Sequence, residues 1–195
     1  GDTSEVSIRV GKGLVYDSGG VMDKGTHMPG MINDMLGSAC VLARAIYFAM
    51  NRDQLAQTTH FVLALAENRD GGEAYLPDQI LMGYNGTTVE VTHTDAEGRL
   101  VLADAMAWTC DTLTANGKQI VSISTTATLT GAAAMALGIP YTALFLKGDD
   151  PDALTRLRGL GESCGDLVWL CQPVTAGTPS SWPASALTCA TPAPS

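Results

Sequence analysis

The segment His93–Leu100, HTDAEGRL, places the carboxylates of Asp95 and Glu97 and the guanidinium of Arg99 within five positions. Carboxylate oxygens are the ligands that hard divalent cations prefer, and fixed positive charge stabilises negative charge that develops during a reaction. Acidic residues at the start of a helix also cap free N–H groups and complement the helix dipole. For an isolated pattern of this kind the capping role is the commoner one, so the segment alone leaves both interpretations open.

A second group of charged residues lies upstream. Asp17 precedes Ser-Gly-Gly, where paired glycines allow tight turns, and Asp34 stands just before a predicted helix. Lys12 lies between two glycines and Lys24 follows shortly after. The glycines around Lys12 do not form a phosphate loop, because the G-x-x-x-x-G-K-[ST] spacing is absent. Each of these residues alone would more often be a turn, capping or surface residue than a ligand.

Three motifs that follow one another along the chain favour a role as ligands over a role in capping or turns. They are Gly11–Gly20 (GKGLVYDSGG), His93–Leu100 and Ala127–Ala132 (ATLTGA). Together they resemble the leucyl aminopeptidase family, also called cytosol aminopeptidases, which are two-metal peptidases. Family-like segments between the motifs extend the resemblance over about Ile8–Pro173.

The resemblance implies a metal-dependent aminopeptidase that hydrolyses the N-terminal bond of peptides, leucine-type, with a water activated by two divalent ions, zinc or manganese. It implies five metal ligands, the first as a neutral amine: Lys12, Asp17, Asp34, Asp95 and Glu97. It implies two catalytic cations, Lys24 beside the scissile carbonyl and Arg99 holding a bicarbonate. It implies a substrate pocket lined by Met31, Thr128, Leu129 and Gly131.

The sequence departs from the family pattern near these ligands. The Lys24–Asp34 interval is one residue shorter, Leu36 replaces a glycine beside a ligand, and His93 replaces an asparagine. We expect Leu36 to shift Asp34, and an extended loop around Asn116-Gly117 in the long stretch that follows Arg99. The alternative function is therefore a catalytically weak or inactive aminopeptidase-like structural subunit of a larger assembly.

Hydrophobic patterning predicts the elements that would position these residues. Apolar and β-branched runs predict strands at Val6–Leu14, His60–Leu65, Thr87–Val91, Gln119–Ser124 and Tyr141–Phe145. Helical spacing predicts helices at Gly37–Met50, Leu100–Leu113 and Ala132–Leu137. Alternating strands and helices predict an α/β fold with a mixed, largely parallel sheet and helices on both faces. By resemblance it is an aminopeptidase catalytic domain whose C-terminal part is missing.

Composition changes abruptly near the C-terminus. Residues 174–195 contain no Asp, Glu, Lys or Arg and are rich in Pro, Ser, Thr and Ala. We expect residues 1–173 to form a partial aminopeptidase catalytic domain, and residues 174–195 to be a tail that is disordered or non-native. By comparison with the family, a separate N-terminal domain is also expected to be missing.

The overall composition limits the possible partners. Hydrophobic residues make up 46% and charged residues 16%, which predicts a folded core. A net charge of −9 argues against nucleic acid as a partner.

The apolar stretch Leu129–Leu146 contains Gly and Pro, and predicts a buried helix, turn and strand rather than a membrane span. Five widely spaced cysteines are typical of reduced thiols in a cytoplasmic protein. The expected partners are peptide substrates and further copies in a homo-oligomer, the family hexamer, or a larger assembly.

Overall fold

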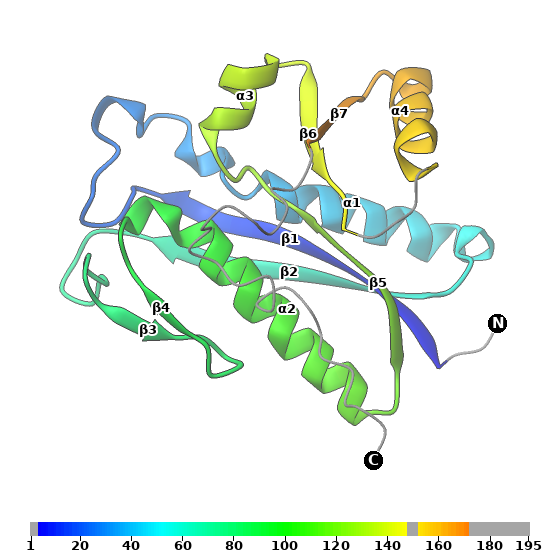
Figure 1. Cartoon of the computed structure of the whole chain (residues 1–195), viewed down its shortest axis with the longest axis horizontal. Helices are drawn as coiled ribbons and strands as arrows, with labels where there is room; N and C mark the ends of the chain where they lie inside the picture. The colour runs from blue at the N-terminus through cyan, green and yellow to red at the C-terminus, as the bar shows by residue number, and fades with distance from the viewer. Residues whose placement is uncertain (1–3, 148–151, 172–195) are drawn as a thin grey trace. The chain divides into compact units, whose positions relative to one another are not determined.

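Residues 4–147 and 152–171 are described by a computed structural model, in which the chain divides after Leu129 into two units (Figure 1). The first unit contains, in order, β1 (Glu5–Asp17), η1 (Gly25–His27), η2 (Met31–Asn33), α1 (Leu36–Met50), η3 (Arg52–Gln54), β2 (Thr58–Asn68), β3 (Ile80–Met82), β4 (Thr88–Glu90), η4 (Thr94–Ala96), α2 (Glu97–Ala115) and β5 (Gln119–Thr126). The second unit contains α3 (Gly131–Leu137), β6 (Tyr141–Phe145), α4 (Ala153–Cys164) and β7 (Leu167–Cys171).

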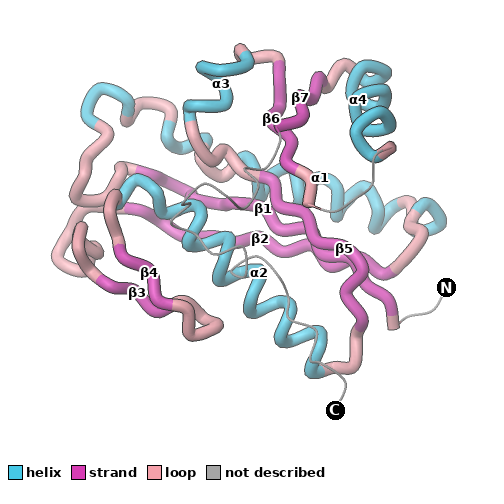
Figure 2. The backbone as a smooth tube through the Cα atoms, viewed as in Figure 1, coloured by secondary structure: helices cyan, strands magenta, loops and turns pink. Residues whose placement is uncertain are grey.

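A three-stranded parallel sheet of order β2-β1-β5 forms the centre of the first unit. Helices α1 and α2 lie on opposite faces of this sheet (Figure 2). Parallel strands need crossover connections, and α1 supplies the crossover from β1 to β2. The central strand β1 is therefore covered on both faces, and it carries the side chains that both helices approach.

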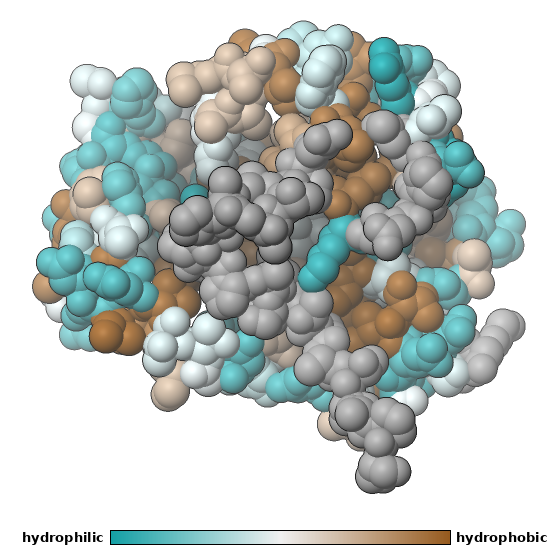
Figure 3. Space-filling model, in the orientation of Figure 1, coloured by the Kyte–Doolittle hydropathy of each residue, from teal (hydrophilic) through white to brown (hydrophobic). Residues whose placement is uncertain are grey.

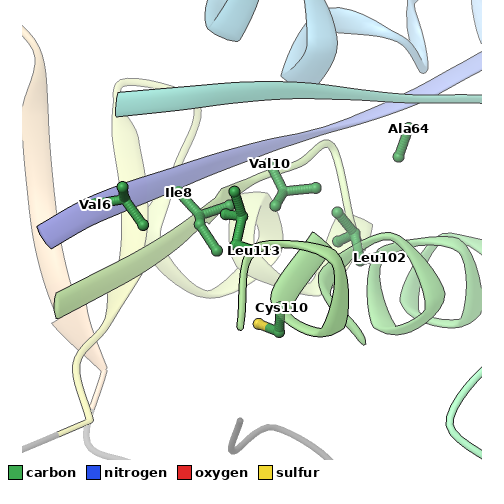
Figure 4. Close-up of a cluster of buried hydrophobic side chains, with 7 residues drawn as sticks. All are labelled: Val6, Ile8, Val10, Ala64, Leu102, Cys110 and Leu113. Atoms are coloured by element: carbon green, nitrogen blue, oxygen red, sulfur yellow. The ribbon is translucent and has the colours of Figure 1, made fainter. Parts of the chain in front are cut away.

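The main hydrophobic core lies between the sheet and α2 (Figure 4). Val6, Ile8 and Val10 alternate along β1 and point toward α2, because successive residues of a strand face opposite sides. All three are fully buried. The remaining members of the cluster come from β2 and α2, and are Ala64, Leu102, Cys110 and Leu113.

The other face of β1 is lined by glycines where α1 packs. A Cβ atom on Gly11 would lie 2.5 Å from the Cα of Ser38, and a Cβ on Gly37 would lie 2.2 Å from the carbonyl oxygen of Thr126. Ser38 Oγ donates a hydrogen bond of 2.7 Å to the Gly11 carbonyl. The glycines therefore allow the start of α1 to contact the sheet backbone directly, and this places the loop that carries Asp34 next to β1.

This close approach predicts a large effect of one methyl group. Gly37→Ala should lower the free energy of unfolding by about 1–3 kcal/mol, because the added Cβ meets backbone atoms that have little room to move. Urea denaturation checks this, with Gly72→Ala as the control, since a Cβ at Gly72 meets nothing within 4 Å. Equal stability of the two variants would contradict the packing described here.

A β-bulge near the end of β1 sets the direction of Asp17. The pairing of β1 with β2 shifts between Leu14 and Tyr16, so Val15 is an extra residue on β1. A bulge of this kind reverses which face the following side chains point to. Asp17 pairs with Asn68, and Lys12 with Ala64. Because residues 64 and 68 lie on the same face of β2, the bulge places Asp17 on the same face as Lys12.

Two smaller sheets complete the described fold. Strands β3 and β4 form an antiparallel hairpin in the first unit, and the surface in this region includes hydrophobic residues (Figure 3), where Ile80 and Met82 are exposed. In the second unit, β6 and β7 pair in parallel and α4 packs against β7.

The predicted α/β fold with a parallel sheet and helices is confirmed. Each predicted strand and helix overlaps one of the same type. Elements β3, α4 and β7 were not predicted. The extended loop expected around Asn116-Gly117 is wrong, because α2 continues to Ala115 and only residues 116–118 separate it from β5.

Other expectations have different outcomes. The stretch 129–146 does form helix, turn and strand, but the expectation that it is buried is wrong, because α3 contains no buried residue and Ile139 is 93% exposed.

Cys40, Cys164 and Cys171 are free, whereas Cys110 is disulfide-bonded, which contradicts the expectation of reduced thiols for that residue. Within the described ranges, the helices are too short or too polar to span a bilayer. The expected tail, 174–195, lies outside the described residues.

Candidate metal centre

Lys12 stands at the centre of a buried group of charges. Its side chain extends from β1, and Nζ lies 2.8 Å from Asp34 Oδ2 and 3.0 Å from Glu97 Oε1. Asp34 follows η2 and Glu97 begins α2, so three separate segments meet here. All three residues are less than 10% exposed. Such a buried cluster of opposite charges is expensive to desolvate, which makes it a candidate functional site.

Gly98 provides the space that the Lys12 side chain occupies. A Cβ atom at residue 98 would lie 2.5 Å from Lys12 Cε and 2.8 Å from Nζ. Thr128 then fixes both ends of the contact, since its carbonyl oxygen accepts from Lys12 Nζ at 3.0 Å and its Oγ1 donates to Asp34 Oδ1 at 2.7 Å. The glycine in the segment AEGR is thus explained by packing against the lysine.

A second ammonium group adjoins the first. Lys24 Nζ lies 2.7 Å from Asp17 Oδ2 and also pairs with Asp95 Oδ1. Burial alone lowers the pKa of Lys24, but its bonds to these two carboxylates outweigh burial and raise that pKa above its usual value. Burial raises the pKa of Asp17, but hydrogen bonds from Lys24, Asn68 and the Gly19 N–H outweigh it and lower that pKa. Asp17 is therefore held as a carboxylate.

Three of the carboxylates converge on one point. Asp17, Asp34 and Glu97 are all buried, and each offers an oxygen such that the three oxygens lie within 4.8 Å of one another. Asp34 Oδ2 and Asp95 Oδ1 are buried without a hydrogen bond of acceptable geometry, although each is paired with a lysine. Formally, four carboxylates against two ammonium groups leave two excess negative charges. This donor set fits divalent cations, which prefer carboxylate oxygen.

Asn68 orients two of these carboxylates, and the sequence did not single it out as a site residue. From the end of β2, Nδ2 lies 2.8 Å from Asp17 Oδ1, 3.1 Å from the Thr94 carbonyl and 3.4 Å from Glu97 Oε2. Asp17 and Asn68 are paired residues at the carboxyl ends of neighbouring parallel strands. That position is the signal that could have identified Asn68, because ligand sites form at the carboxyl ends of such strands.

Thr94 and Tyr75 were also missed. Thr94 is fully buried, and its Oγ1 donates to the Gly19 carbonyl at 2.6 Å and accepts from the Met22 N–H at 3.1 Å. Tyr75 donates its hydroxyl to the Thr94 carbonyl at 2.7 Å. Burial and the carboxylates of Glu97, Asp17 and Asp95 raise the pKa of Tyr75 to about 12, so the phenol stays protonated. These bonds hold the Gly19 turn and η4 against each other.

His93 caps the short helix η4. Its Nδ1 accepts a hydrogen bond of 3.2 Å from the backbone N–H of Asp95. The N-cap position of a helix favours short side chains with a hydrogen-bond acceptor close to the backbone, such as asparagine. The histidine therefore performs locally the capping that an asparagine at this position performs.

The expected shift of Asp34 by Leu36 stays a prediction, but Asp34 remains part of the cluster. Leu36 begins α1 and is 46% exposed, so its side chain is directed partly to solvent. Asp34 still reaches Lys12 and Thr128. The close backbone contact in this turn is made at Gly37, where glycine is kept.

The remaining predicted residues lie around or away from this cluster. Arg99 is exposed in the first turn of α2, and no carboxylate pairs with it within the described part of the chain. Met31 precedes Asp34 by one turn, and its carbonyl accepts from the Asp34 N–H at 3.2 Å. Leu129 follows Thr128 and is 45% exposed. Gly131 begins α3 in the second unit.

Comparison with known proteins gives a consistent assignment. Residues 2–175 match the model of the cytosol aminopeptidase family, catalytic domain. The chain is 42% identical over 163 residues to a probable cytosol aminopeptidase of Desulfovibrio desulfuricans, covering 83% of this chain and 31% of that protein. It is 43% identical over 160 residues to the human probable aminopeptidase NPEPL1, covering 82% and 29%.

A solved structure agrees with these relatives. The leucine aminopeptidase LAP1 of Caenorhabditis elegans superposes with a TM-score of 0.75 at 36% identity, covering 90% of this chain and 34% of that one. The chain therefore spans about a third of the length of the relatives it matches. Because the family model matches residues 2–175, the chain belongs to the cytosol aminopeptidase family and matches its catalytic domain.

Proposed function

We propose that this chain forms the metal-binding part of an aminopeptidase that removes N-terminal residues from peptides, with two divalent ions, zinc or manganese. The observation that carries the proposal is the convergence of buried Asp17, Asp34 and Glu97 on one point beside Lys12. Family membership supports the reaction class, because the relatives are named as aminopeptidases. Leucine-type specificity rests on the resemblance and on the name of the similar worm enzyme.

The donors that would hold the ions are oxygen atoms with one nitrogen. They would come from Lys12 as a neutral amine, Asp17, Asp34, Asp95 and Glu97. In the structure, the ammonium groups of Lys12 and Lys24 contact the oxygens that divalent ions would otherwise contact. When bound, the ions supply Lewis acidity, which activates a water and polarises the scissile carbonyl.

The side chains around the donors have separate tasks in this proposal. Lys24, held by Asp17 and Asp95, provides a positive charge for the oxyanion that forms at the carbonyl. Arg99 is free of ion pairs in the described residues and can bind bicarbonate, which would transfer protons. Asn68 keeps Asp17 and Glu97 oriented, and Thr128 does the same for Asp34. Oriented ligands increase metal affinity.

Substrate recognition is also part of the proposal. Met31, Thr128, Leu129 and Gly131 would line the pocket for the first side chain. Specificity for a free N-terminus would follow from coordination of the α-amine. Homo-oligomer formation, which the family resemblance implies, stays a prediction.

Metal content separates the enzyme from the structural-subunit alternative. After reconstitution with Zn²⁺ or Mn²⁺ and removal of excess ion, we expect about two ions per chain. The loaded protein should hydrolyse leucine p-nitroanilide but not its N-acetylated form, which lacks a free amine. Metal analysis and absorbance assays measure both. Absence of bound metal after reconstitution would contradict the proposal and favour the subunit.

A further inference from the structure

Arg9 is a charged residue in an unusual place on the central strand. It lies in the middle of β1, three residues before Lys12, so the two side chains leave opposite faces of the sheet. Its paired neighbours are Phe61 on β2 and Ser124 on β5. A strand covered on both faces normally carries apolar residues at such a position. A half-buried arginine here costs stability, so its presence needs an explanation.

Polar side chains fix the guanidinium of Arg9. Nη1 donates at 3.1 Å both to Ser122 Oγ and to the Ile8 carbonyl. Ser122 Oγ is in turn 2.7 Å from Ser7 Oγ, and Gln57 donates to Ser7. These bonds use one nitrogen of the guanidinium. Among the described residues, the other N–H groups of Arg9 make no hydrogen bond, and this network orients them.

A second arginine faces the same space without a counter-charge. Arg44, on α1, lines one pocket together with Arg9. Burial first and the charge of Arg44 second lower the pKa of Arg9 below its usual value. The chain has 20 acidic and 11 basic residues, yet among the described residues no carboxylate forms an ion pair with either guanidinium. Two guanidinium groups without an acid are complementary to a doubly charged anion.

The walls of this space add an apolar component. The pocket that contains both arginines has a volume of about 230 Å³, and Phe48 and Phe61 line it with rings stacked at 6.2 Å. A larger pocket of about 640 Å³ adjoins it and shares both rings. Its other lining residues are partly apolar, such as Ala45 and Ala56, and partly polar, with Arg52 among the polar ones. The combined space suits a ligand with an anionic head and an apolar body.

We propose that Arg9 and Arg44 form a binding site for a small organic phosphate with an aromatic or aliphatic body, on the face of the sheet opposite the metal centre. The phosphate would accept hydrogen bonds from both guanidinium groups, which match its geometry in a bidentate manner. The body would lie against Phe48 and Phe61. This site needs no metal, so it is independent of the proposed peptidase activity.

Phenyl phosphate is the probe for this site, used by calorimetry with the purified chain after treatment with a chelator. We expect saturable binding that weakens about tenfold to a hundredfold in Arg44→Gln, because each lost charge-assisted bond has that order of effect. Arg44 is exposed, so this variant should fold normally. Arg9→Lys is a second variant that keeps the charge but loses the bidentate geometry. Arg158→Gln, an exposed arginine on α4, is the matched control.

The outcomes separate the parts of the proposal. Weaker binding in Arg44→Gln and Arg9→Lys, with unchanged binding in Arg158→Gln, supports the site. Inorganic phosphate should bind at least about tenfold more weakly than phenyl phosphate, and equal affinity would overturn the role of the two rings. No saturable binding, or equal binding in all variants, would overturn the site itself. Neither result bears on metal content or peptidase activity, which are measured separately.

Discussion

Glu97→Ala should abolish peptidase activity and remove metal from the protein. The substitution deletes an anionic donor from a buried cluster in which Asp17 and Asp34 are the only other carboxylates that converge within the described residues. It also leaves Lys12 with one carboxylate partner instead of two. We expect turnover to fall by at least about a thousandfold, with fewer than two ions retained per chain. Metal analysis and hydrolysis of leucine p-nitroanilide give the two readouts.

Two further variants distinguish a ligand from a residue needed only for folding. Glu97→Gln keeps the volume and one oxygen, so it should fold as the parent does but bind metal more weakly. Glu73→Ala removes an exposed acid from a loop and should leave both readouts unchanged. A Glu97→Ala protein that retained two ions and normal turnover would show that Glu97 is not a ligand.

Lys24→Met should lower kcat by about tenfold to a thousandfold while KM changes comparatively little. This is the pattern for an interaction made mainly in the transition state. In the structure, Lys24 contacts Asp17 and Asp95, whereas Lys12 contacts Asp34 and Glu97, so removal of Lys24 leaves the contacts of Lys12 in place. The bound metal should therefore be retained, which separates this variant from Glu97→Ala.

Steady-state kinetics and metal analysis of the same preparations test this expectation. Lys147→Met, which removes an exposed lysine of the second unit, is the control. If Lys24→Met lost most of its metal, Lys24 would be a structural partner of the carboxylates instead of a group that acts on the substrate.

Much of the fold followed from hydrophobic patterning, because apolar runs such as Tyr141–Phe145 have bounds set by their own composition. The end of β1 did not, since a valine, a tyrosine and an aspartate continue the strand beyond Leu14 and the polar residues weaken the pattern. Helix α4 was missed because ALTRLRGLGESC mixes charges and two glycines with its leucines. Such a helix depends on packing against β7, which only the folded chain shows.

Some residues of the metal centre could be identified from the sequence, and others could not. Lys12, Asp17, Asp34 and Glu97 were identified through the family resemblance, and the structure brings them together. Asn68 could not be ranked from its segment, because an asparagine after an apolar run is usually a strand end or a turn residue. Its role depends on the register between β1 and β2, which places it beside Asp17. Register between strands far apart in sequence is a tertiary property.

The bulge at Val15 has a consequence for how this kind of centre tolerates insertions and deletions. Lys12 and Asp17 are separated by 17 − 12 = 5 positions, an odd number. In an unbroken strand, only an even separation keeps two side chains on one face. The motif therefore carries an odd spacing that works only together with a break in pairing. If one residue between Lys12 and Asp17 were deleted, the two side chains would share a face only if the bulge were lost as well. If two residues were inserted there, the bulge would still be required. Parity, more than distance along the chain, decides which length variants of the motif keep both side chains on the same face of the sheet.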